Sequence, residues 1–113
     1  DTYGAQTPEE TLQLFIAALK AGDIELASRY FALETNENSL DYLTHKTWQK
    51  ILQEAQGRGK IPSVIEMLEQ ANPAGSAMKG NFGFEIRNEK NELIGDIGLR
   101  LNEQSHVWKI QSM

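Results

Sequence analysis

The stretch that decides the fold is residues 82–111, FGFEIRNEKNELIGDIGLRLNEQSHVWKIQ. In three runs of this stretch, apolar residues alternate with polar residues or glycine, as in strands that bury one face. The runs are separated by residues 88–91 and 102–105, whose asparagines are typical of turns. The sequence therefore predicts three antiparallel strands joined by two hairpins.

The lengths of the two turns predict which strand residues lie opposite one another. The expected pairs are Ile86–Leu93, Phe84–Gly95, Phe82–Ile97, Leu101–His106, Leu99–Trp108 and Ile97–Ile110. Both hairpins then place their apolar residues on the same face of the sheet. That face must be covered, and the residues before the sheet can supply helices to cover it.

Two short helices are predicted at the start of the chain. Thr7 can cap the first helix, Pro8 suits its first turn, and Glu10 completes a capping box. Gly22 can end this helix with left-handed backbone dihedrals. Asp23 follows directly and can cap a second helix.

Two more helices are predicted before the strands begin. Asn38 or Ser39 can cap the third, whose apolar stripe runs from Leu40 to Ala55. A fourth opens at Pro62 and is ended by residues 72–73, an Asn-Pro pair. Residues 74–77 then read as a link of small residues.

The 113 residues fit one domain with one core. We expect a polar lead-in over residues 1–6, a helical part over 7–73 and an antiparallel β part over 77–112. The fold class is therefore α+β, with N-terminal helices packed on one face of a C-terminal antiparallel sheet of at least three strands.

The composition excludes several classes of function. Sixteen acidic against eleven basic residues give a net charge of −5, which repels nucleic-acid backbones. The chain has no cysteine, so disulfides and thiolate metal sites are excluded. No apolar run approaches the ~20 residues of a membrane span. No spacing of residues specifies a metal or a cofactor.

The numbering starts at Asp1, before a polar lead-in and without an initiator methionine. This beginning suits a chain from which a targeting or anchor segment was removed. We therefore expect an extracytoplasmic protein, secreted or in the cell envelope, with a cytoplasmic location as the alternative.

Both ends of the chain resemble the nuclear-transport-factor-2-like (cystatin-like cone) superfamily. The residues that carry the resemblance are 7–10 (TPEE), 21–23 (AGD) and 107–110 (VWKI). It implies a cone-like fold in which a curved antiparallel sheet wraps a long helix, often leaving a pocket. Two departures are the three predicted strands, fewer than in that superfamily, and the two helices where it has one. A generic helix-on-sheet domain is the alternative.

An acid/base site has weak candidates on the helices alone. Asp41 and His45 stand four residues apart on one helix face, and Tyr30 could join them in a small pocket enzyme of the isomerase or hydrolase type. The competing interpretation is an exposed contact near the start of a helix. On the strands, Glu85 and Asp96 fall on the face opposite the apolar one, so the chain is more readily explained as noncatalytic.

A ligand pocket could be lined by aromatic residues. The candidates are Tyr30, Trp48, Phe84 and Trp108, with His106 as a polar group at the rim. Core packing explains the four aromatic residues equally well. Gly95 lies on the inward face and leaves space opposite Phe84, where a pocket or a bend could form.

The opposite face of the sheet is flat and mixed in charge. It carries Glu85, Arg87, Asp96, Arg100, Lys109 and Gln111, with Gly83, Gly98, Ile94 and Val107 among them. This face is either solvated or the contact face of a homodimer or protein partner. The sequence thus predicts a noncatalytic domain that binds a protein partner or a small apolar ligand, with the pocket enzyme as the alternative.

Overall fold

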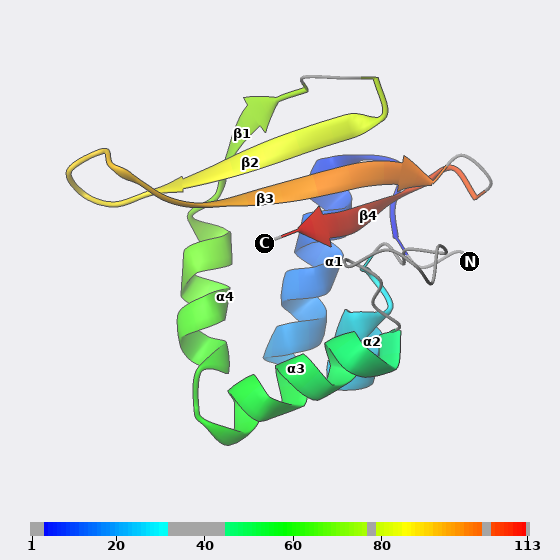
Figure 1. Cartoon of the computed structure of the whole chain (residues 1–113), viewed down its shortest axis with the longest axis vertical. Helices are drawn as coiled ribbons and strands as arrows, with labels where there is room; N and C mark the ends of the chain where they lie inside the picture. The colour runs from blue at the N-terminus through cyan, green and yellow to red at the C-terminus, as the bar shows by residue number, and fades with distance from the viewer. Residues whose placement is uncertain (1–3, 32–44, 77–78, 103–104, 113) are drawn as a thin grey trace.

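The computed structural model describes residues 4–31, 45–76, 79–102 and 105–112. These residues form four helices, all on one side of an open four-stranded antiparallel sheet (Figure 1). The helices are α1 (Pro8–Lys20), α2 (Ile24–Ser28), α3 (His45–Gly57) and α4 (Ile61–Glu69). The strands are β1 (Asn72–Gly75), β2 (Asn81–Arg87), β3 (Leu93–Asn102) and β4 (Val107–Ser112), adjacent in that order. The α+β class predicted from the sequence is confirmed.

The first two helices begin at the residues that the sequence predicts. The Thr7 hydroxyl accepts a hydrogen bond from the Glu10 amide (3.2 Å), and Pro8 opens α1. Gly22 follows α1 with φ +73°, which a residue without a Cβ adopts at little cost. The Asp23 carboxylate accepts a hydrogen bond from the Leu26 amide (3.1 Å) and so caps α2.

The next two helices agree with the prediction where the structure describes them. The expected caps of the third helix, Asn38 and Ser39, lie outside the described residues, and α3 is described from His45 onward. Helix α4 begins at Ile61, one residue before Pro62. None of the helices described here is long and apolar enough to cross a membrane.

Strand β1 corrects the prediction that residues 72–73 only end a helix and that residues 74–77 are a link. The sheet begins at Asn72, which pairs with Glu85, and Pro73 pairs with Phe84. The side chains of β1 are all exposed, so its pairing rests on the backbone and leaves no alternation of apolar residues to detect.

The first hairpin has a different register from the predicted one. Ile86 lies opposite Gly95, Phe84 opposite Ile97 and Phe82 opposite Leu99. The loop extends to Glu92, whose carbonyl accepts a hydrogen bond from the Asn88 amide (3.0 Å). The observed register differs from the predicted one by two residues, and the longer loop accounts for one of them. A β-bulge accounts for the other: Ile86 pairs with Gly95 and Arg87 with Leu93, so Ile94 is left unpaired between them. Since the shift is even, the predicted apolar face is preserved.

The second hairpin is also shifted by two residues. Trp108 lies opposite Leu101, and Ile110 opposite Leu99. His106 is an exposed turn residue with φ +58° instead of a strand residue at the rim of the apolar face. Its amide donates a hydrogen bond to the Asn102 carbonyl (2.8 Å), which closes the turn.

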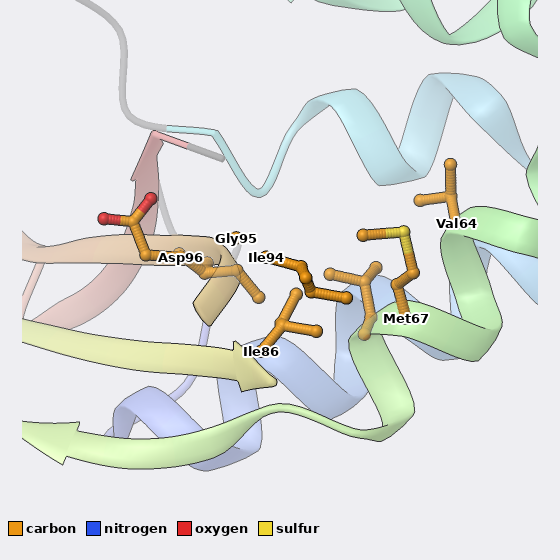
Figure 2. Close-up of a pocket in the computed structure, with 8 residues that line it drawn as sticks. Val64, Met67, Ile86, Ile94, Gly95 and Asp96 are labelled. Carbon is orange, nitrogen blue, oxygen red and sulfur yellow. The ribbon is translucent and has the colours of Figure 1, made fainter. Parts of the chain in front are cut away.

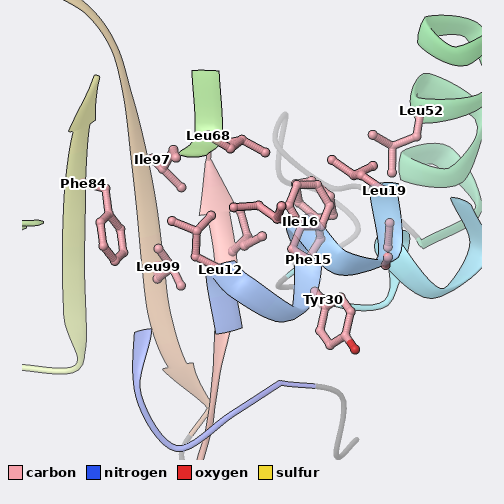
Figure 3. Close-up of a cluster of buried hydrophobic side chains, with 14 of the residues drawn as sticks. Leu12, Phe15, Ile16, Leu19, Tyr30, Leu52, Leu68, Phe84, Ile97 and Leu99 are labelled. Carbon is pink, nitrogen blue, oxygen red and sulfur yellow. The ribbon is translucent and has the colours of Figure 1, made fainter. Parts of the chain in front are cut away.

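The core lies between α1 and the inner face of the sheet (Figure 3). From the helix it contains Leu12, Phe15, Ile16 and Leu19, and from the sheet Phe84, Ile86, Ile97, Leu99 and Ile110. All nine are at most 4% exposed. Burying this apolar face provides the main driving force for packing the helices on the sheet.

The outer edge of β4 is covered by two segments from early in the chain. The Trp108 amide donates to the Ala5 carbonyl, and the Ile110 amide donates to the Tyr30 carbonyl, both at 2.8 Å. Ala5 and Phe31 form isolated bridges to this strand. The last strand is therefore hydrogen-bonded on both sides.

Lys109, which the strand alternation places on the outer face of the sheet, is buried within the chain itself. It is 2% exposed, and its Nζ donates a hydrogen bond to the Arg29 carbonyl (2.7 Å). Burial, and then the nearby positive charge of Arg29, lower the pKa of Lys109 to about 8. The outer face is therefore covered at β4, although Asp96 and Arg100 on β3 are exposed.

Candidate functional site

The best candidate site is a hollow between α4 and the neighbouring ends of β2 and β3 (Figure 2). Its volume is about 430 Å³, and it opens to solvent on one side. Its lining comprises Val64, Met67 and Leu68 of α4, Ile86 of β2, and Ile94, Gly95, Asp96 and Ile97 of β3. We call this hollow the α4–β3 groove.

The bulge in β3 shapes the α4–β3 groove. Ile94 precedes the outward-facing Asp96 by two residues, so regular alternation along β3 would place both side chains on the same face. The unpaired position re-aims Ile94, and its side chain lies beside those of Ile86 and Met67 (Figure 2). Ile94 remains 49% exposed and Met67 41% exposed, so two large apolar side chains line the open side.

Gly95 leaves part of the groove empty. A Cβ built at this position would lie 3.8 Å from Ile86 Cδ1, which is an ordinary contact. The prediction that Gly95 leaves free space agrees with this geometry, although its cross-strand neighbour is Ile86 instead of Phe84.

The chemistry of the groove is that of an apolar binding site. Asp96 carries the one ionisable side chain in the lining, and its carboxylate points away from the other lining side chains (Figure 2). Within the described ranges, no three histidine, aspartate or glutamate side chains gather in a way that could hold a metal ion. The groove can therefore bind an apolar group, but its lining offers no pair of groups for acid/base chemistry.

The aromatic residues proposed as ligand-binding from the sequence lie elsewhere. Tyr30 and Phe84 are buried in the core, and Trp48 and Trp108 are partly buried against it. The ring of Trp48 stacks on Phe31, with centroids 3.8 Å apart. None of these residues, nor His106, lines the α4–β3 groove.

The weak catalytic candidates are not brought together by the part of the chain that the structure describes. Asp41 lies outside the described residues, and so does the side chain of His45, the first residue of α3. Tyr30 is 7% exposed in the core. The acid/base hypothesis from the sequence therefore stays a prediction.

Sequence reasoning missed the groove because two of its features are not visible in the alternation of residues. The apolar spacing of residues 61–69 indicates a helix stripe that contains Val64 and Leu68, whereas Met67 lies on the flank of that stripe, where the pattern predicts no site. The alternation of residues predicts Ile94 on the polar face, but the bulge changes the direction of this one side chain without changing the pattern around it. The sequence signal for the site was Gly95 alone.

Comparison of the chain with protein-family models, curated proteins and solved structures finds no match. The resemblance to nuclear-transport-factor-2-like domains is therefore untested by these comparisons and stays a prediction from the sequence.

Proposed function

We propose that this domain is a noncatalytic binding module whose α4–β3 groove takes a small, uncharged apolar ligand. The observation that carries the proposal is the groove itself, a half-open hollow of about 430 Å³ with an apolar lining. Pockets for small molecules commonly enclose about 300–1,000 Å³ and are mostly apolar. The half-exposed Met67 and Ile94 gain the most from being covered.

The absence of charge in the lining selects the class of ligand. Transferring a charged group from water into an apolar site is unfavourable unless an opposite charge or hydrogen-bond donors receive it. The eight lining residues include no basic side chain, and the Asp96 carboxylate is turned away (Figure 2). An aliphatic chain or a neutral ring system fits this lining better than a carboxylate or a phosphate.

The test is a titration with N-phenyl-1-naphthylamine, an uncharged probe whose emission rises in apolar surroundings. We expect saturable binding at one site per chain. Gly95→Val should weaken it roughly tenfold, because the added methyl groups occupy volume that the ligand needs. The variant should fold, since the new Cβ makes only an ordinary contact with Ile86.

Gly83→Val is the matched control, because it makes the same change in the neighbouring strand at a position outside the groove. A Cβ at Gly83 would lie 3.8 Å from the Gly75 carbonyl oxygen, also an ordinary contact. Equal probe affinity in both variants would overturn the proposal. If the probe fails to bind the wild-type protein at all, the groove does not accept small ligands and a protein partner becomes the better explanation.

A further inference from the structure

The outer face of β2 and β3 carries charges arranged symmetrically about two opposed glycines. Gly83 lies directly opposite Gly98 in the register of the two strands. Along β3, Asp96 precedes Gly98 by two residues and Arg100 follows it by two. Side chains two residues apart share a face, and the buried Ile97 and Leu99 mark the other face. Asp96 and Arg100 therefore flank Gly98 on the side away from the helices.

The same arrangement recurs on β2. Glu85 and Asn81 flank Gly83, and they pair with Asp96 and Arg100 respectively. One side of the glycine pair thus carries the carboxylates of Glu85 and Asp96, and the other carries the Arg100 guanidinium and the Asn81 amide. Glu85 already pairs with Arg87 (3.0 Å), whereas no ion pair of Asp96 or Arg100 is found among the described residues.

We propose that this face binds a second copy of the chain, with a two-fold axis running through Gly83 and Gly98 across the strands. Rotation by a half turn about that axis places the part of each strand before its glycine opposite the part after the same glycine in the partner. Asp96 of one copy then faces Arg100 of its partner, and the same pair forms a second time by symmetry. Glu85 faces the Asn81 amide, which can donate a hydrogen bond to its carboxylate.

The two glycines allow the backbones of the two sheets to approach at the centre of this contact. With no side chain between them, the flanking pairs of charges can come within reach of one another. The contact is centred on β2 and β3 because Lys109 on β4 is covered by Arg29. Exposed Asp96 and Arg100 are free to reorient toward a partner.

The size of the face indicates a weak dimer. Strands β2 and β3, about 4.8 Å apart and paired over about seven residues, cover roughly 230 Å² per copy. Stable complexes bury about 800 Å² per partner, and weaker ones bury less. We therefore expect a dissociation constant in the micromolar range, governed largely by the reciprocal charge pairs.

The test is a charge exchange followed by sedimentation velocity over a range of concentrations. Asp96→Arg and Arg100→Asp should each weaken the dimer at least tenfold, since each replaces both attractive pairs with like charges. The double variant Asp96→Arg/Arg100→Asp should restore dimerisation to within about threefold of wild type. An equimolar mixture of the two single variants should also dimerise, because each then carries the charges that the other needs.

Two results would overturn the proposal. One is a wild-type chain that stays monomeric up to millimolar concentration, and the other is a dimer that is unaffected by the single reversals or not rescued by the exchange. Both residues are exposed, so circular dichroism should report folded variants throughout. The probe titration of Gly95→Val is read independently, because the α4–β3 groove lies on the helix side of the sheet.

Discussion

The Thr11 hydroxyl donates a hydrogen bond to the carbonyl oxygen of Trp108, 97 residues further along the chain, at 3.0 Å. The same hydroxyl accepts a hydrogen bond from the Ala5 amide (2.9 Å), and Thr11 is fully buried. One side chain of α1 therefore holds both the N-terminal segment and the last strand.

Replacing Thr11 with valine keeps the shape of the side chain but removes both hydrogen bonds. We expect Thr11→Val to lower the free energy of unfolding by about 1–3 kcal/mol, because the Ala5 amide and the Trp108 carbonyl each lose a partner. Urea denaturation measures the change. Thr11→Ser keeps the hydroxyl and should lose less; a loss in Thr11→Ser as large as that in Thr11→Val would show that the two hydrogen bonds are not the main contribution of Thr11.

Gly4 is needed where the N-terminal segment pairs with the edge of β4. Its φ is +143°, and a Cβ there would collide with the Trp108 carbonyl oxygen. Gly4→Ala should displace the bridge between Ala5 and Trp108 and accelerate hydrogen exchange of the Trp108 amide, which donates to Ala5.

Gly59→Ala provides the comparison for this variant. Gly59 also has a positive φ (+70°), but no atom lies within 4 Å of the Cβ that would be added. Gly59→Ala should lower the free energy of unfolding by about 1 kcal/mol through backbone strain. It should not accelerate exchange of the Trp108 amide beyond what this loss of global stability explains. If Gly4→Ala likewise accelerates exchange of the Trp108 amide no more than its loss of global stability explains, then the added Cβ is accommodated without displacing the bridge between Ala5 and Trp108.

Lys109 should make stability depend on pH in the alkaline range. Its pKa is about 8 in the folded protein against 10.5 for an unperturbed lysine. Between these values the unfolded chain binds more protons than the folded one, so the free energy of unfolding should rise with pH, by about 3 kcal/mol between pH 7 and 10.5. Urea denaturation between pH 7 and 10.5 would measure this rise.

The control for this prediction is Lys109→Met, which removes the titrating group and leaves the other alkaline titrations in place. The difference in unfolding free energy between wild type and variant should grow in favour of wild type from pH 8 to 10.5. A difference that is constant over this range would show that the Lys109 pKa is not lowered.

Trp48 should tolerate replacement by phenylalanine better than its size suggests. The Trp48 ring lies nearly parallel to that of Phe31 (10°), but its buried Nε1–H has no hydrogen-bond partner in the described part of the protein. Trp48→Phe keeps an aromatic ring in the stack and removes the unsatisfied donor, so we expect a change within about 1 kcal/mol. Trp48→Ala should cost about 3 kcal/mol. Thermal denaturation distinguishes the two; comparable losses would mean that the indole is required.

The sequence predicts the helices and the inner sheet face well because local chemistry determines them. Thr7 and Asp23 cap their helices through contacts within three residues. Phe84, Ile97 and Ile110 belong to three strands in which inward apolar residues alternate with outward ones, and all three are buried. These signals do not depend on the rest of the fold.

The features that the sequence did not predict depend on distant partners. Strand β1 exists because β2 offers its backbone, and Lys109 is buried because the Arg29 carbonyl reaches its amine. The α4–β3 groove depends on the bulge at Ile94, which shifts the register by one residue without leaving a mark in the apolar pattern. A site formed in this way becomes visible only when the strands are paired.

The coverage of the two edges of the sheet has a consequence for aggregation. On one side, β1 contains Pro73, which has no amide hydrogen to offer, and a register irregularity follows it. On the other side, Ala5 and Tyr30 already accept the amide hydrogens of Trp108 and Ile110. Among the described residues, neither edge presents an incoming strand with a continuous ladder of free backbone groups, which protects the native protein against growth into fibrils.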